Sequence, residues 1–202
     1  MSLEQEKQER ILNAALSEFS QKGFKKASTN EIVKEAHIAK GLLFHYFNNK
    51  KDLFLFLYDY SLQIFMNDFV GKIDLSEKDV LTRLRQMACL KVELIGKHPQ
   101  LFNFMLAANF EESEEVKPGL KLRNQEVMAG SMAMFLGDID VSKFKEGIDI
   151  PRALHVMIWT LEGLRNQEQE KARSIHLDAL YYEQVLKEMD IYLELFRKCF
   201  YR

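Results

Sequence analysis

Residues 36–57 read AHIAKGLLFHYFNNKKDLFLFL, and this stretch decides the fold. The four residues from Ala36 to Ala39 suggest a turn, and a short helix is predicted from about Lys40 to Tyr46 or Phe47. Asn48 and Asn49 break the helical pattern, because asparagine side chains compete for backbone hydrogen bonds. A long helix is then expected from Lys50 to about Phe69. The stretch thus predicts a short helix between a tight turn and a long connecting helix.

The residues before this stretch predict two further helices. The first should run from about Glu4 to Lys22 and end at Gly23, because apolar residues recur on one face. Those residues are Ile11, Leu12, Ala15, Leu16 and Phe19. The second should open at Ser28, which stands three residues before Glu31 in the spacing of a capping box. Two short helices joined by such a turn predict a helix-turn-helix, with Ile38 facing the core.

The rest of the chain reads as a series of helices. Beyond Lys72 the apolar spacing predicts helices at about 77–97, 99–109, 118–136, 151–170 and 177–200. Each of the three prolines lies near one of these helix starts, where its missing N–H costs little. The chain is therefore expected to be all-α, with an N-terminal three-helix domain followed by a larger helical one.

The bulk composition is that of a globular protein, with hydrophobic residues making up 47% of 202. No apolar run approaches the roughly eighteen residues that a membrane span needs. The polar N-terminus is unlike a signal peptide, so we expect a cytoplasmic protein without membrane contact. Cys89 and Cys199 form no disulfide framework, and we expect both thiols to be buried and reduced.

Charge is unevenly spread along the chain. Residues 1–51 carry nine Lys/Arg against six Glu, a net +3, and residues 52–202 carry nineteen Lys/Arg against twenty-four Asp/Glu, a net −5. A basic head on an acidic body is typical of DNA-binding proteins, although a solvated lysine-rich surface would give the same count.

The stretch from Ala36 to Leu57 also resembles the signature of the TetR family of one-component bacterial regulators. It joins a turn, a short helix with Lys-Gly and an aromatic pair around His45, a polar break, a lysine pair and an aspartate-led hydrophobic helix. Upstream, the matching residues are Ala14, Ala15, Phe19, Gly23, Phe24 and the STNEI stretch of residues 28–32. The resemblance covers residues 9–57 closely and the rest only in length and helical content.

This resemblance implies a helix-turn-helix DNA-binding domain over residues 1–49 and a helical ligand-binding and dimerisation domain over residues 50–202. The third helix would lie in the major groove of a double-stranded DNA operator, and an effector bound elsewhere would change the spacing of the two heads. We expect a palindromic operator, because a two-fold homodimer presents two equivalent recognition helices. Repression is expected, although repression and activation look identical in sequence.

Four residues of the third helix are candidate DNA contacts on their own chemistry. Lys40 and Gly41 stand at its start, where a helix N-terminus attracts phosphate and glycine permits close backbone approach. Leu42 and His45 project three residues apart and could reach one wall of the groove.

Further contacts follow from the resemblance alone. Tyr46, Thr29 and either Lys50 or Lys51 would hold backbone phosphates, which position a protein on DNA without reading its sequence. Each has a simpler alternative, since Thr29 could only cap a helix, Tyr46 only pack, and the lysines only be solvated.

Two positions depart from the family pattern. His37 stands where glycine is common, so a positive φ there would carry a modest strain cost. Leu42 replaces a small or hydroxyl residue, which favours apolar contact with a thymine methyl over a hydrogen bond to a base edge.

Large, soft apolar residues collect between Met87 and Trp159, where this family commonly has a ligand cavity. Methionine and phenylalanine suit an adaptable apolar pocket with a few polar anchors. The candidate ligand-binding residues are Cys89, Phe102, Met105, Asn109, Met128, Met132, Trp159 and Glu162. They favour a small hydrophobic effector, a lipid or an aromatic compound, although plain core packing is the simpler account of any one of them.

The last two helices carry apolar stripes that exceed what one small domain is expected to cover. The stripes are Leu154, Met157, Ile158 and Leu161, then Tyr182, Val185, Leu186, Met189, Leu193, Phe196 and Phe200. We expect the homodimer to form through these two helices.

Other functional classes lack their motifs. The run from Glu111 to Glu115 lacks the alternating ligands and glycine of a calcium loop, and we expect a solvated loop there. The five histidines show no metal-ligand spacing, so neither a metal nor another cofactor is predicted. No nucleophile motif, phosphate-binding glycine loop or acid–base pair indicates an enzyme. A scaffold that has lost DNA binding remains as an alternative, against which the retained Lys40, His45 and lysine pair argue.

Overall fold

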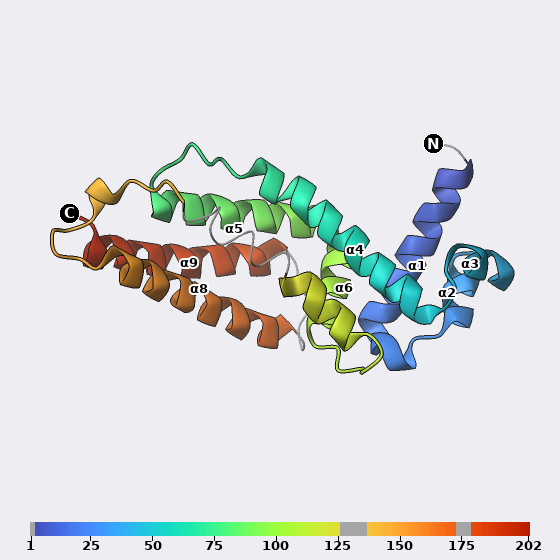
Figure 1. Cartoon of the computed structure of the whole chain (residues 1–202). Helices are drawn as coiled ribbons and strands as arrows, with labels where there is room; N and C mark the ends of the chain where they lie inside the picture. Colours follow the sequence, from blue (N-terminus) through green and yellow to red (C-terminus); the bar gives the residue numbers. More distant parts are fainter. Residues whose placement is uncertain (1–2, 126–136, 173–178) are drawn as a thin grey trace. The chain divides into compact units, whose positions relative to one another are not determined.

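The computed structural model describes residues 3–125, 137–172 and 179–202, and these residues are mostly helical (Figure 1). The helices are α1 (Leu3–Lys26), α2 (Thr29–Glu35), α3 (Lys40–Tyr46), α4 (Lys50–Asp68), α5 (Val80–Lys97), α6 (Pro99–Asn109), α8 (Ile150–Ala172) and α9 (Ala179–Phe200). Residues 117–125 are also helical, and 3-10 turns span Val70–Lys72 and Val141–Lys143. No strand occurs within these described ranges, and the all-α prediction is confirmed.

The described residues form two compact units. The first unit holds the chain up to Asp68 and the segment from Lys97 to residue 125, and the second holds residues 69–96 and the described residues from 137 onward. The chain therefore leaves the first unit after α4 and returns to it at α6. These units are defined by packing, whereas the boundary predicted at residue 49 divides the chain by function, and that boundary stays a prediction.

Four phenylalanines form the centre of the first unit, in which α1 and α6 are the most extensively packed helix pair. Phe19 and Phe24 come from α1, Phe54 from α4 and Phe104 from α6, and none is more than 2% exposed. The ring centroid of Phe54 lies 5.0 Å from Phe19, 5.4 Å from Phe24 and 5.1 Å from Phe104, each in an edge-on arrangement that aromatic rings favour. Phe54 thus joins α1, α4 and α6.

The second unit contains the paired helices α8 and α9. Their stripes meet inside the unit, where Met157, Met189, Leu193 and Phe196 are buried in one cluster. The expectation that these stripes exceed what one chain can cover was therefore wrong for their central residues. The apolar side chains left exposed belong to other positions, namely Val156, Trp159, Ile191 and Leu195.

Two further expectations concern single features. Cys89 on α5 and Cys199 on α9 are exposed free thiols, so the expected burial was wrong. In the described part of the chain, no helix combines the length and apolar character needed to cross a membrane.

Candidate nucleic-acid interface

The turn between α2 and α3 has the geometry that the sequence predicted. The Ile38 N–H donates to the carbonyl of Val33 at 3.0 Å, and Ile38 packs against the buried core of the first unit. His37 has φ 53°, so histidine occupies the left-handed conformation that glycine would adopt more easily. The strain, on the order of 1 kcal/mol, is borne by a turn that the core on both sides holds in place.

Helix α3 is anchored by one residue and exposes the opposite face. Leu43 is 1% exposed, while Lys40, Gly41, His45 and Tyr46 are all exposed. Because successive helical residues turn by about 100°, Gly41 and His45 stand opposite Leu43. A Cβ at Gly41 would meet nothing within 4 Å, so the chain's own packing does not require glycine there.

The other predicted α3 residues lie beside this face. The Lys40 ammonium is 5.9 Å from the centroid of the Phe44 ring, and the His45 and Tyr46 rings pack edge-on at 5.4 Å. Leu42 is half-buried. The structure therefore brings five predicted contacts onto one seven-residue helix, with His45 central and Leu42 partly withdrawn.

The two neighbouring lysines at the start of α4 differ in surroundings. The Lys50 ammonium donates to the carbonyls of Lys25 and Ala27, both at 3.2 Å, and lies 4.7 Å from the centroid of the Phe24 ring. Lys50 thereby ties α4 to the segment between α1 and α2, whereas Lys51 is exposed. Of this predicted pair, Lys51 is the lysine whose charge is available to a partner.

The predicted break before α4 is its N-terminal cap. The Asn49 Oδ1 accepts the Asp52 N–H at 2.8 Å, and the Asn48 side chain donates to the Asp52 carboxylate at 2.9 Å. Asparagine is a preferred N-cap because its side chain satisfies an amide that the helix leaves without a partner. This cap fixes where α4, and with it the exposed Lys51, begins.

The predicted capping box at the start of α2 does not form. Ser28 is the N-cap residue, but its side chain makes no cap hydrogen bond, and Glu31 is 4.0 Å from Lys34. The Ser28 N–H donates instead to Glu18 of α1 at 2.9 Å. Tertiary contact with α1 has replaced the local cap, and Thr29 is left half-buried at the first turn of α2.

The described ligand-binding candidates are divided between the two units. Phe102, Met105 and Asn109 lie on α6 in the first unit, where Met105 packs against the core and Asn109 is exposed. Trp159, which is 66% exposed, and the half-buried Glu162 lie on α8 in the second unit. Met128 and Met132 lie outside the described residues.

Cys89 lines a shallow hollow of about 540 Å³ on the second unit. Its Sγ contacts the guanidinium of Arg85, which also bonds the Asp190 carboxylate of α9 with Nη2 to Oδ2 at 3.1 Å. This hydrogen bond to Asp190 is the leading cause that raises the pKa of Arg85. Lys72 and Gln86 complete the polar lining.

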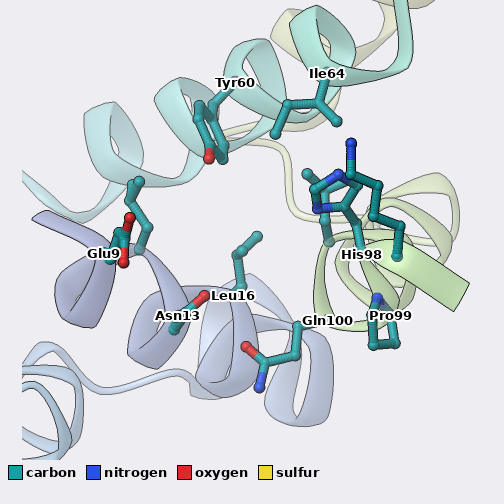
Figure 2. Close-up of a pocket in the computed structure, with 11 residues that line it drawn as sticks. Glu9, Asn13, Leu16, Tyr60, Ile64, His98, Pro99 and Gln100 are labelled. Atoms are coloured by element: carbon teal, nitrogen blue, oxygen red, sulfur yellow. The ribbon is translucent and has the colours of Figure 1, made fainter. Parts of the chain in front are cut away.

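A second hollow, of about 310 Å³, lies between α1, α4 and the start of α6 (Figure 2). Tyr60 and Ile64 face Asn13 and Leu16 across it, and His98 and Gln100 border it from the start of α6. None of the predicted ligand-binding residues lines this hollow. Its walls come from three helices far apart in the sequence, so no local spacing indicates it.

Among the described lysines of the second unit, Lys91 on α5 has the largest pKa shift. Burial, together with the positive charge of Arg165 on α8, lowers the pKa of Lys91 from 10.5 to about 8. Lys91 is half-buried and Arg165 is exposed. Two like charges that act on each other attract an anion more strongly than a single exposed lysine does. No group of three or more His, Cys, Asp or Glu that could hold a metal ion occurs among the residues described.

Lys91→Met should stabilise the protein at pH 7 by about 1–3 kcal/mol, because methionine keeps the length without a charge to desolvate. The folded-state pKa of Lys91 lies below its unfolded value of 10.5, so the unfolded state binds more protons between these values. The wild-type penalty is therefore complete below pH 8 and fades as the pH rises towards 10.5. Urea unfolding at pH 7 and pH 9.5 measures both effects, with the exposed Lys187→Met as control. Equal gains at the two pH values would contradict this assignment.

Comparison with known proteins places these features in a family. The family model described as "Bacterial regulatory proteins, tetR family" matches residues 11–57, which run from α1 through α2 and α3 into α4. The fatty acid metabolism regulator protein of Bacillus subtilis (strain 168) is 24% identical over 162 residues, which make up 75% of this chain and 78% of that protein.

Solved structures share the fold over nearly the whole chain. A TetR family transcriptional regulator from Chloroflexus aurantiacus J-10-fl has a TM-score of 0.64 at 19% identity, covering 98% of this chain and 94% of that one. The transcriptional regulator FadR from Bacillus subtilis, in complex with stearoyl-CoA, has a TM-score of 0.61 at 18% identity, covering 94% and 97%.

Proposed function

Because this chain is a transcriptional regulator of the TetR family, we propose that it binds a palindromic operator as a homodimer and represses transcription until a small hydrophobic effector releases it. One observation carries the proposal. The face of α3 opposite Leu43 is exposed, and it contains Gly41, a glycine that the chain's own packing does not require. A bare backbone there suits close approach to DNA.

The proposed contacts divide by what they read. His45, with Leu42 beside it, would reach base edges in the major groove and set sequence preference. Lys40, Tyr46 and Lys51, together with Gly41 and Thr29, would hold phosphates and fix the position of α3 on the duplex. Lys50 belongs to the support of this surface, because its ammonium already bonds two backbone carbonyls.

The proposed dimer interface is the outer face of α8 and α9. Val156 and Trp159 on α8 and Ile191 and Leu195 on α9 are 43–66% exposed, and each pair recurs at three or four residues. Large apolar side chains grouped on two neighbouring helices are typical of an interface between subunits. A two-fold dimer of this kind would present two copies of α3 to two half-sites.

The proposed effector is a fatty acyl compound with an acidic group. Two relatives support this class, one named as a regulator of fatty acid metabolism and one solved with stearoyl-CoA. In this chain the positive charges of Lys91 and Arg165 in the second unit would receive the acidic group. The acyl chain would be held by apolar side chains, which is consistent with the predicted hydrophobic effector.

Selection from a random double-stranded DNA library tests the DNA-binding part. We expect an enriched palindrome with half-sites about one helical turn apart or slightly more. Lys51→Ala should then weaken binding to every sequence and reduce the salt slope by roughly one unit for each head, whereas His45→Ala should change the enriched sequence. Lys50→Ala should lower the unfolding temperature instead, and the exposed Lys121→Ala serves as a charge control.

Either of two results would count against the proposal. If no sequence is enriched, the proposed sequence-specific DNA recognition is rejected. If Lys121→Ala and Lys51→Ala reduce the salt slope equally, the proposed DNA-binding surface is rejected. Release of the selected duplex by an added acyl-CoA, and a reporter that rises when the regulator is deleted, test the effector class and repression separately.

A further inference from the structure

Helix α1 contains a break that takes the Phe24 amide out of the helical hydrogen-bond pattern. Gly23 has φ 67° and ψ 174°, a conformation in which a side chain would be strained. The Phe24 N–H therefore cannot continue the helical ladder of α1. A new turn starts here, with the Ala27 N–H donating to the Gly23 carbonyl at 3.2 Å. This turn leads directly into α2 and the helix-turn-helix.

The amide freed by the break is taken by a residue 87 positions later. Glu111, which follows α6, accepts the Phe24 N–H with Oε2 at 2.7 Å. Its other oxygen, Oε1, accepts the Ser113 N–H at 2.9 Å. A Cβ at Gly23 would lie 3.2 Å from the same Oε2, so the close approach of the carboxylate also depends on the glycine. Glu111 is half-buried, and the expectation that its loop is simply solvated was wrong.

Ser113, the second hydrogen-bond partner of Glu111, lies in a segment that is itself fixed by hydrogen bonds. Ser113 is 1% exposed, and its carbonyl accepts the N–H groups of Val116 and Lys117 at the start of the helix over residues 117–125. That helix is bonded to α4, through Arg123 Nη2 to the Asp59 carboxylate at 2.9 Å and the Tyr58 hydroxyl to Asn124 at 2.5 Å. One carboxylate thus connects the α1–α2 junction with the start of residues 117–125.

We propose that Glu111 is a positioning residue for DNA binding, which sets the orientation of α2 and α3 relative to α6 and the helix over residues 117–125. This inference rests on the proposed function. Each of its two hydrogen bonds is charge-assisted, and such bonds are shorter and stronger than neutral ones. A displacement of α6 or of residues 117–125 must either move the Phe24 amide or break its bond to Glu111. Glu111 touches no surface proposed to contact DNA, so its effect would pass through the α1–α2 junction.

The test compares Glu111→Ala and Glu111→Gln with Glu115→Ala and Glu115→Gln. Glu115 lies in the same loop and is exposed, so its variants change charge equally without touching Phe24. In Glu111→Ala, amide hydrogen exchange at Phe24 and Ser113 should be faster by about tenfold or more, while exchange at Leu43 stays unchanged. Glu111→Gln keeps one acceptor and should fall between wild type and alanine.

The functional readout is affinity for the duplex selected by the wild-type protein. Glu111→Ala should weaken binding by about tenfold with an unchanged salt slope, because no phosphate contact is removed. If Glu111→Ala does not fold, the same comparison is made with Glu111→Gln. An affinity equal to that of the Glu115 variants, with faster exchange at Phe24, would show a merely structural contact and overturn the inference. Failure of the wild-type protein to select any duplex would instead reject the proposed function.

Discussion

Replacing Ile191 by aspartate should convert the proposed dimer into monomers and abolish detectable binding to the two-half-site duplex. Ile191 is 64% exposed on α9, about one helical turn before Leu195, which is 51% exposed. A carboxylate buried in an apolar interface without a partner costs several kcal/mol, and a two-fold dimer would contain two of them. Native mass spectrometry measures the mass of the particle, and the duplex reports whether two heads bind together.

The control for this experiment is Leu75→Asp. Leu75 is an exposed aliphatic residue of the same unit, 43% exposed, and lies outside α8 and α9. Its variant should remain a dimer. Leu193 and Phe196 are unsuitable for this test because they are 7% and 3% exposed inside the unit, so their loss would unfold it. A dimeric Ile191→Asp protein would require another interface.

Phe54→Ala should cost about 3–5 kcal/mol of unfolding free energy, because it leaves a cavity at the meeting point of α1, α4 and α6. The centroid of the Phe54 ring lies within 5.4 Å of the centroids of three other phenylalanine rings, two from α1 and one from α6. For a chain of this length the midpoint of thermal unfolding should fall by roughly 6–20 °C. Differential scanning calorimetry measures this shift.

Phe56→Ala provides a matched comparison on the same helix. Phe56 is 46% exposed and packs against Phe47 at 5.2 Å, so the same substitution there should cost about 1 kcal/mol or less. If the two variants lose equal unfolding free energy, Phe54 does not have the central role in packing α1, α4 and α6 that its contacts indicate.

Local patterns in the sequence predicted most helices and the helix-turn-helix. The range of α6 was predicted to the residue, and α3 was predicted to within one, because apolar spacing, proline and the asparagine pair all act over a few residues. Such features depend on neighbours in the chain, which is why they are visible without a structure. The positive φ of His37 was raised only as a condition, from the resemblance to a family in which glycine is common at this position.

Contacts between distant residues could not be predicted in the same way. The capping of the Ser28 amide by Glu18 and of the Phe24 amide by Glu111 depends on where α1 and α6 pack, and neither glutamate has a local pattern that marks it. Lys50 belonged to a predicted phosphate-binding pair, yet its ammonium bonds two carbonyls of the chain. In the second unit, a helical stripe alone did not indicate which of its residues face inward.

The contacts at the end of α1 also bear on how this protein could be engineered. A fragment ending at residue 49 would keep the recognition helix but lose Phe54, Lys50, Phe104 and Glu111, which cover or bond the end of α1. A fragment of residues 1–49 should not keep its fold. A chimera that binds DNA should therefore carry residues 50–68 and 97–125 from the same parent.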